Sequence, residues 1–561
     1  MSKQSVYDKK PWLKSYSEGI PAHIEYPEVQ MFEIIEKGAR EIPDQPAIYF
    51  FGKKITYREL KNLTERLATA FADLGVKKGD VVALHLPNYP QFIIGYFAAL
   101  RIGALVTSLS LLATAPEARY QLSDTGAETI VLDERYMPIF QQIRAETKIK
   151  RVILTSLQDF LPGRPPVHKE IPGAHWLLDL LNKYQPNPPK VKINPKEDPA
   201  VLQYTGGTTG VPKGAILTHY NLYSNAVQTM TWYKILIYGK EINMANLPLF
   251  HLFGQELAMN MGLYSGSMIV LNPDPRDIAS LLNLIKTTKP TIMAGVPTLF
   301  MKIVDHPDVT SKKVDFGCFK VCGSGAAPCP PELIKKFGSI TKASLIEGYG
   351  MTETSPVVTL TPMSKDAKIK IGSVGLPVPD TEVRLVDIDT GTKEVPLGEP
   401  GEIVVRGPQV FKGYWNKPEE TKNQLKNGWL YTGDIAKMDE DGYFYIVDRK
   451  KEMVIVSGYK VYPREVDDVL YEHPAVQMAA TVGIPDPEKP GSEKVKAFIV
   501  LKPGYSPSEE LKEEIIRHAR KSLAPYKVPK FIEFRNEVPT SLVGKVLKRP
   551  LKEEEQRKIK K

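Results

Sequence analysis

Apolar residues in the first two hundred positions alternate between helical spacing and short strand-like runs. Residues 56–75 place leucines and a phenylalanine on one helical stripe, and the apolar run Val81–Leu84 follows a Lys-Gly-Asp turn. Strand-like runs return at 127–131 and 151–154, with helical stretches between them. This alternation predicts an α/β fold in which helices cover layered sheets.

The pattern changes after Gly372. Short β-rich runs at 383–386, 402–405 and 443–446 are separated by glycine and aspartate. Runs of this length with these breakers are typical of antiparallel strands joined by turns. We therefore predict a small barrel or antiparallel sheet here.

A last mixed segment begins after the charged run Arg449–Lys451. It combines helical stretches at 463–471 and 508–522 with strand-like runs between them, and it has the size of an independent small domain. We therefore predict an N-terminal domain over 1–448 and an α+β C-terminal domain over 452–561, with the boundary at 449–451.

The composition is that of an ordinary globular protein, with 42% hydrophobic and 25% charged residues among 561. The 74 basic and 65 acidic side chains leave a net charge of +9, which is modest over this length. A dedicated nucleic-acid binder would concentrate that charge in a patch, so no nucleic-acid partner is predicted. Mild basicity suits small anions such as nucleotides and carboxylates.

The longest apolar stretch, residues 92–115, is long enough to span a membrane by length alone. Arg101 and Gly103 interrupt it, and a charge at the centre of a span is costly. A buried helix over Gln91–Ile102 followed by a strand over Ala104–Ser108 is the better interpretation. No transmembrane segment is predicted.

The compartment is indicated by the N-terminus and the cysteines. The polar opening Met1–Lys10 has no apolar signal region, which favours a cytoplasmic protein. Cys318, Cys322 and Cys329 are an odd number for a disulfide framework, and no nearby histidine completes a zinc site. They are interpreted as small reduced core residues.

The loop Tyr204–Gly214 carries the densest candidate chemistry. It holds four glycines, three threonines and Lys213, so backbone N–H groups, hydroxyls and a positive charge can face one anion. A flexible surface turn is the plain alternative. Spacing excludes the mononucleotide P-loop, because proline precedes the lysine and glycine follows it, and the dinucleotide fingerprint fails at 323–328 and 348–353. The loop is predicted to bind a polyphosphate.

Seven blocks of sequence along the chain match one family in the expected order. They are 204–214, Leu247–His251, Glu347–Glu353, Tyr431–Asp434, Asp448–Arg449, Val456–Pro463 and Pro539–Lys545. With these blocks the chain resembles the adenylate-forming enzymes: acyl-CoA synthetases, aryl-CoA ligases, adenylation domains of peptide synthetases and firefly luciferase. The resemblance implies a large N-terminal domain of layered α/β sheets plus a small β-barrel, and a small C-terminal domain joined by a hinge.

Within this family the chain is most similar to medium- and long-chain fatty acid–CoA ligases. Gly206 stands where many members have serine, and the opening Pro11–Tyr16 and the run 447–458 also match that subgroup. The resemblance implies that ATP, Mg²⁺ and coenzyme A convert a small carboxylic acid to its thioester through an acyl-adenylate. An aryl-CoA or short hydroxyacid-CoA ligase is the alternative.

Three other functions are less favoured. They are a luciferase, a peptide-synthetase module and a non-catalytic binding protein of the same fold. A homodimer is allowed for, and oligomeric state is left open.

The resemblance also implies roles for catalytic residues. Lys545 would bridge the α-phosphate and the acyl carboxylate, Thr352 would hold the α-phosphate, and Glu353 would bind Mg²⁺. His251 would line the acyl and thioester region. The plain alternatives are that Lys545 is a solvated lysine, that Glu353 is an ordinary surface carboxylate, and that His251 is a core histidine.

A larger set of residues is implied for the nucleotide and coenzyme A. The phosphates would be held by Thr205, Gly206, Gly207, Thr208, Thr209, Gly210 and Lys213. Gly348 and Tyr349 would lie against adenine, and Asp434 with Arg449 would hold the ribose. A core aromatic is the alternative for Tyr349, and a simple turn for Asp434.

The C-terminal domain is implied to rotate between the two half-reactions. Lys451 would be the hinge, and Gly458 with Tyr459 would line a tunnel for the pantetheine arm once Lys545 has withdrawn.

The acyl pocket is expected near Gln255, Gly325 and Gly350. Acetyl-CoA synthetases have tryptophan at the position of Gly350, so glycine is interpreted as leaving room for a medium- or long-chain acid. The segment 253–263 is expected to border this pocket, with plain helix core as the alternative.

Overall fold

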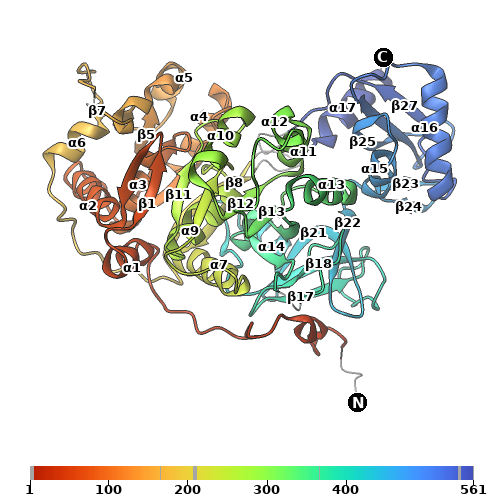
Figure 1. Cartoon of the computed structure of the whole chain (residues 1–561), viewed down its shortest axis with the longest axis horizontal. Helices are drawn as coiled ribbons and strands as arrows, with labels where there is room; N and C mark the ends of the chain where they lie inside the picture. Colours follow the sequence, from red (N-terminus) through yellow and green to blue (C-terminus); the bar gives the residue numbers. More distant parts are fainter. Residues whose placement is uncertain (1–4, 164–165, 206–211, 365–366, 541–544, 560–561) are drawn as a thin grey trace.

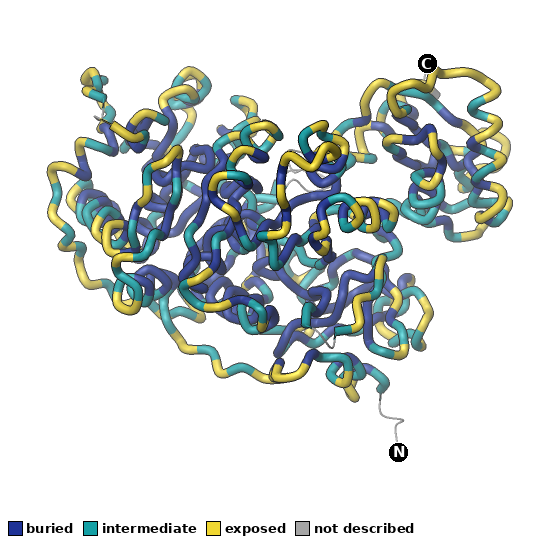
Figure 2. Tube along the Cα trace, in the orientation of Figure 1, coloured by how far each residue is buried: buried dark blue, intermediate teal, exposed yellow. Residues whose placement is uncertain are grey.

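The computed structural model describes residues 5–163, 166–205, 212–364, 367–540 and 545–559. A large N-terminal body of sheets and helices carries a smaller C-terminal domain at one side, drawn in blue in Figure 1. Both parts have buried strands at their centres (Figure 2). The predicted layered α/β fold is confirmed.

The first sheet has eight strands, and those in its middle are parallel. Its order is β19 (Gly413–Tyr414), β9 (Lys213–Thr218), β8 (Pro199–Thr205), β4 (Leu105–Ser108), β3 (Val81–His85), β5 (Thr129–Asp133), β6 (Arg151–Thr155) and β7 (His175–Trp176). The predicted strands at 81–84, 127–131 and 151–154 are therefore confirmed. Antiparallel β8 and β9 bring Thr205 opposite Lys213 at the two ends of the glycine-rich loop.

The second sheet has nine strands and carries the site described below. Its order is β16 (Leu376–Pro377), β15 (Val357–Leu360), β14 (Leu345–Gly350), β13 (Val321–Ser324), β12 (Ile292–Gly295), β10 (Ile242–Ala245), β11 (Met268–Leu271), β1 (Pro46–Phe50) and β2 (Lys53–Thr56). β12, β13 and β14 are parallel neighbours, so their carboxyl ends meet at one edge.

Two early helices show how local sequence produces this core. The predicted 56–75 helix is α2 (Tyr57–Asp73), which Thr56 and Glu59 cap by exchanging side-chain bonds with each other's backbone N–H. The apolar stretch forms α3 (Pro90–Arg101), buried from its first residue through Leu100, and then β4. Among the described residues no helix is long and apolar enough to cross a bilayer.

The third sheet is antiparallel, as the β-rich texture after Gly372 predicts. It contains β17 (Glu382–Val386), β18 (Gly401–Arg406), β21 (Trp429–Met438), β20 (Leu425–Lys426) and β22 (Phe444–Arg449). An N-terminal arm, red in Figure 1, runs from this sheet toward α1 (Glu33–Glu41). Trp12 is buried against the sheet, and the hydroxyl of Tyr7 donates to the carbonyl of Val395 at 3.0 Å.

The C-terminal domain has a core of its own. The hairpin β23 (Val454–Val456) and β24 (Tyr459–Val461) packs beside the sheet β25 (Val476–Pro485), β26 (Glu493–Leu501) and β27 (Phe531–Phe534). Helices α15 (Pro463–Tyr471), α16 (Glu509–Ser522) and α17 (Lys548–Ile559) cover that sheet. The shared apolar cluster includes Leu470, Ala497 and Ile515.

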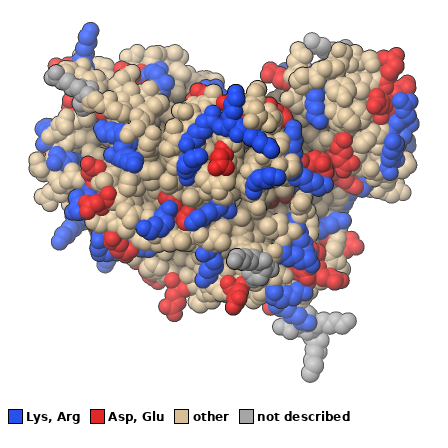
Figure 3. Space-filling model, viewed as in Figure 1, with Lys and Arg blue, Asp and Glu red and all other residues tan. Residues whose placement is uncertain are grey.

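Charge is mixed over the surface. On the face shown in Figure 3, Lys and Arg form an arc near the centre, with acidic side chains inside it and along the C-terminal domain. Basic and acidic side chains therefore lie close to one another on this face.

Candidate active site

Two cavities meet at the carboxyl end of β14. The apolar cavity, about 840 Å³ including its mouth, lies between the second sheet and the helical segment 252–264. The interdomain cavity, about 1280 Å³, lies between the N-terminal body and the C-terminal domain. Residues 347–350 line both cavities, so one strand separates them.

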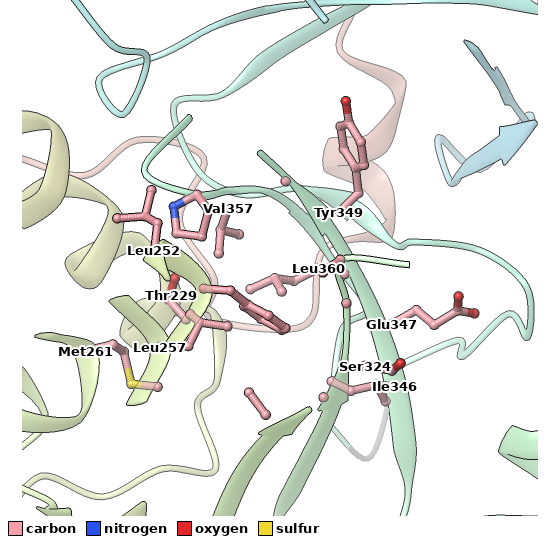
Figure 4. Close-up of a pocket in the computed structure, with 18 of the residues that line it drawn as sticks. Thr229, Leu252, Leu257, Met261, Ser324, Ile346, Glu347, Tyr349, Val357 and Leu360 are labelled. Atoms are coloured by element: carbon pink, nitrogen blue, oxygen red, sulfur yellow. The ribbon is translucent and has the colours of Figure 1, made fainter. Parts of the chain in front are cut away.

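The alternation of side chains along β14 explains the different character of the two cavities. Figure 4 shows Leu257 and Met261 on one side of the strand, while Glu347 points away on the other side. Glu347 is buried, and this burial raises the pKa of its carboxyl group to about 7. One face of β14 therefore presents apolar side chains to the apolar cavity, and the opposite face presents an ionisable group to the interdomain cavity.

Tyr349, Asp434 and Arg449 converge at the interdomain cavity. The Tyr349 hydroxyl donates to Oδ2 of Asp434 at 2.7 Å, and Nε of Arg449 lies 3.3 Å from Oδ1. Register accounts for the second contact, because Asp434 on β21 pairs with Arg449 on β22. Burial, with the charge of Asp434, raises the pKa of Tyr349 well above its usual range, so the phenol remains a donor.

Lys545 reaches the same cavity from the C-terminal domain. Its loop is closed at the base by a bond from the Leu547 N–H to the carbonyl of Pro539 at 2.8 Å. Burial, and next the positive charge of Arg449, lower the pKa of Lys545 to about 8. The sequence places this lysine almost two hundred residues from Tyr349, and the fold brings both to one cavity.

His251 lines the apolar cavity. Its Nδ1 accepts the N–H of Phe253 at 3.2 Å, so it caps the short helix α8 (Leu252–Gly254). Burial, and then the charge of Lys545, lower the pKa of His251 to about 4. The ring is neutral at neutral pH and its Nδ1 is already engaged.

Thr352 and Glu353 form the 3-10 turn η6 (Thr352–Thr354) directly after β14. Thr352 lines the apolar cavity, whereas the Glu353 carboxylate is buried and accepts the hydroxyl of Tyr414 at 2.5 Å. Burial raises the pKa of Glu353. Within the described ranges no group of three or more metal-ligating side chains occurs.

Lys213 lies beside this turn. It forms an ion pair with Glu420 of α14 (Pro418–Gln424), and its Nζ is 5.2 Å from the centre of the Tyr414 ring. Burial, and then Lys451, lower the pKa of Lys213, while the charge of Glu353 opposes that shift. Lys213, Glu353 and Lys451 therefore belong to one electrostatic neighbourhood.

Part of the predicted phosphate loop lies outside the described residues. Thr205 and Lys213 are described, at the ends of β8 and β9. The predicted residues that lie outside are Gly206, Gly207, Thr208, Thr209 and Gly210.

Gly458 and Tyr459 lie on the β23–β24 hairpin, among neither set of cavity-lining residues. Gly458 has a φ of 85°, and Tyr459 is exposed with its ring stacked on Tyr526 at 4.7 Å. Lys451 is the second residue after the end of β22.

The predicted acyl residues are divided. Gly325 and Gly350 line the apolar cavity, but Gln255 does not. Gln255 is buried in the π-helical turn Gln255–Asn260, where its Nε2 contacts the carbonyl of Leu249 at 3.4 Å. Residues at helical spacing, Phe253, Leu257 and Met261, line the cavity instead.

The interpretation of Gly350 as an opening needs correction. A Cβ at this position would lie 2.0 Å from the carbonyl oxygen of Pro356, which is backbone and cannot move aside easily. Glycine is therefore required by close packing of two chain segments. Its presence says nothing about room for a longer acid.

Sequence reasoning missed four residues of this region. Glu347 lines both cavities, and Gly323 lines the apolar cavity. The hydroxyl of Tyr414 contacts Glu353, and Glu420 forms an ion pair with Lys213. Tyr414 arrives through the pairing of β19 with β9, which joins positions two hundred residues apart. Glu347 alone had a local signal, because it belongs to one of the seven blocks.

Comparison with known proteins settles the family. The AMP-binding enzyme family matches residues 35–415, and the AMP-binding enzyme C-terminal domain matches 465–545. The chain belongs to the AMP-binding enzyme family. It is an AMP-forming acyl-CoA synthetase, a class that uses ATP, Mg²⁺ and CoA.

Named relatives extend over nearly the whole chain. A long-chain-fatty-acid–CoA ligase of Bacillus subtilis (strain 168) is 39% identical over 98% of this chain and 99% of its own length. One from Escherichia coli O6:H1 is 38% identical over 98% and 99%. The solved anthranilate CoA ligase AuaEII, in complex with anthranoyl-AMP, has a TM-score of 0.87 and 28% identity, covering 95% of this chain and 99% of that one.

Proposed function

We propose that this synthetase ligates a medium- or long-chain fatty acid to CoA, and that the two cavities hold the two parts of its acyl-adenylate. The observation that carries this proposal is the shared wall at 347–350, with an apolar cavity on one side and Tyr349, Asp434 and Lys545 at the other. The acid tail would enter the apolar cavity. Its carboxylate would then reach the strand end where the nucleotide is held.

The first half-reaction joins two anions. A carboxylate oxygen forms a bond to the α-phosphorus of ATP, and the bond from that phosphorus to the pyrophosphate oxygen breaks. Protonated Lys545 and the hydroxyl of Thr352 would neutralise charge on the α-phosphate as it develops. Glu353 would help to hold Mg²⁺, which would supply further neutralisation of the phosphate charge.

The nucleotide would be oriented in the interdomain cavity by Tyr349, Asp434 and Arg449. Tyr349 would lie against adenine, and Asp434 would accept the ribose hydroxyls with Arg449 beside it. Thr205, Lys213 and the loop between them would hold the β- and γ-phosphates. We assign His251 a contact role in the apolar cavity, because a neutral ring with an engaged Nδ1 is a poor base.

In the second half-reaction the CoA thiol sulfur bonds to the acyl carbon, AMP leaves, and the thiol proton passes to solvent. Lys545 occupies the site in the present arrangement, and Gly458 lies away from it. We propose that the C-terminal domain, over 452–561, turns about Lys451 between steps. The turn would withdraw Lys545 and bring Gly458 and Tyr459 to a pantetheine tunnel.

An aryl acid is the second candidate, because the AuaEII structure named above is an anthranilate CoA ligase. The apolar lining of the cavity, from Leu257 and Met261 to Ile292 and Val321, suits an alkyl tail. We also propose a cytoplasmic location, with a homodimer as the assembly to be tested by light scattering.

The test is CoA-dependent release of AMP and pyrophosphate across saturated acids of two to eighteen carbons, with anthranilate and benzoate in parallel. A maximum among fatty acids supports the proposal. Release with aryl acids alone would reject it.

A further inference from the structure

Along β12, β13 and β14 the residues that line the apolar cavity are small toward the carboxyl ends of the strands and larger toward the amino ends. Toward the carboxyl ends these residues are Ala294, Gly323, Gly325 and Gly348; toward the amino ends they are Ile292 and Val321. Register fixes the levels, since Ala294 pairs with Gly323 and Ile292 pairs with Val321. The cavity is therefore lined by small residues at the carboxyl ends of the strands. At the amino ends the β-branched side chains of Ile292 and Val321 form its floor.

Gly323 differs from the other glycines that line this cavity. A Cβ at Gly325 would lie 2.9 Å from the Phe253 ring, and one at Gly348 would lie 2.8 Å from Leu360. Around a Cβ at Gly323 no described atom lies within 4 Å. Gly323 lies within regular β13, so a side chain there would project into empty cavity space.

Tyr233 completes the floor. It follows α7 (His219–Trp232), lines the cavity, and belongs to the same buried cluster as Ile292 and Val321. Lys320 donates to the carbonyl of Ile235 at 3.5 Å and so ties the end of α7 to the start of β13. The floor is thus formed by residues from the segment after α7 and from the start of β13.

The strand geometry gives the depth. Gly325 is four residue steps along the chain from Val321, which corresponds to about 13 Å at the rise of a parallel strand. An extended peptide residue spans about 3.3–3.6 Å over three backbone bonds, which is about 1.2 Å per bond. We apply the same length per bond to an extended alkyl tail. The depth therefore accommodates about eleven bonds of an extended alkyl tail.

We propose that this cavity selects saturated acids of about ten to twelve carbons, and that Gly323 is the residue that sets the available length. This inference rests on the proposed function. Longer acids would have to displace Tyr233 or leave part of the tail outside. A side chain at Gly323 would shorten the cavity at the level of Ala294.

The test measures kcat/KM for CoA-dependent AMP release with even-numbered acids from four to eighteen carbons. Wild type is expected to peak at ten to twelve carbons. Gly323→Val is expected to lower the value for dodecanoate by about 10- to 100-fold, as steric exclusion of one or two methylenes does, and to spare hexanoate. Tyr233→Ala is expected to move the peak to longer acids.

Cys322→Val is the matched control, because Cys322 lies on the same strand and packs in a different cluster on the opposite face. Its chain-length profile should match that of wild type. A wild-type peak at sixteen or more carbons would overturn the proposal, as would an equal loss at every length in folded Gly323→Val. If Gly323→Val does not fold, the wild-type profile and Gly323→Ala decide. Absence of release with every acid would instead reject the proposed function.

Discussion

The hydroxyl of Tyr349 donates a hydrogen bond of 2.7 Å to Asp434, and this bond connects the end of β14 to the middle of the third sheet. Asp434 also faces Arg449 at 3.3 Å, so both carboxylate oxygens have a partner. The aromatic ring of Tyr349 and the carboxylate of Asp434 are therefore positioned together.

Tyr349→Phe should raise the KM for ATP in pyrophosphate exchange by about 10- to 150-fold, since a hydrogen bond to a charged group contributes about 1.5–3 kcal/mol. The ring remains for stacking, so kcat should fall less than KM rises. Tyr445→Phe is the control, because that hydroxyl contacts Asp439 at 3.0 Å in the same sheet and lies outside both cavities. An unchanged KM in Tyr349→Phe would contradict a positioning role for the bond.

Lys545→Ala should lower the rate of adenylate formation by about 10²- to 10³-fold, the usual effect of removing a preorganised charge from a transition state. Thioester formation from supplied acyl-AMP and CoA should be retained. The two steps are measured separately, by pyrophosphate exchange and by acyl-CoA production. Lys521→Ala, at an exposed position near the end of α16, serves as the control. Equal loss of both steps would refute the role assigned to Lys545.

The pH dependence of adenylation should report Lys545. In the proposed role only its protonated form would neutralise the α-phosphate, and the pKa of Lys545 is about 8. The kcat/KM for adenylation should therefore be constant below that pH and fall about tenfold per pH unit above it. Bound ATP adds negative charge, so kcat should break at a higher pH. Lys545→Arg should remove the break, because guanidinium stays charged; a break that persists in this variant would assign it to another group.

Glu347 predicts a pH dependence of stability. Its pKa is about 7 in the folded protein, against an ordinary value near 4.5, so the folded state holds the proton more tightly. The stabilisation is present below pH 4.5 and is lost as pH rises to about 7, by about 2–4 kcal/mol in the free energy of unfolding. Glu347→Gln should match wild type in Tm at pH 5 and exceed it at pH 8.

The control for this prediction is Glu332→Gln, since Glu332 is an exposed partner of Lys335. Its Tm should follow that of wild type at both pH values. Equal Tm for Glu347→Gln and wild type at pH 8 would mean that the buried carboxylate is ionised without penalty.

Much of the fold follows from local sequence. The helix α2 has a capping pair and a single apolar stripe, and the uniformly apolar α3 lies in the core as its composition requires. Those features act within a few residues, so a pattern along the chain is enough to predict them. The antiparallel third sheet is predicted in the same way from its short runs and turns.

The details of the site depend on contacts between distant segments. Helical spacing from Phe253 selects Leu257 and Met261 for the cavity and turns Gln255 away, so periodicity could have corrected that assignment. The reason for Gly350 is the Pro356 carbonyl, and the partner of Glu353 is Tyr414. Neither contact leaves a pattern in the local sequence.

The strand β14 has a consequence for how such enzymes diversify. Ile346 and Glu347 are adjacent in the chain, yet one lines only the apolar cavity and the other extends to the interdomain cavity. Substitutions at one position can change which acid is accepted while the neighbouring position keeps its own surroundings. Single substitutions in this strand could therefore change the acid specificity of such an enzyme during evolution, while its nucleotide-binding site stays the same.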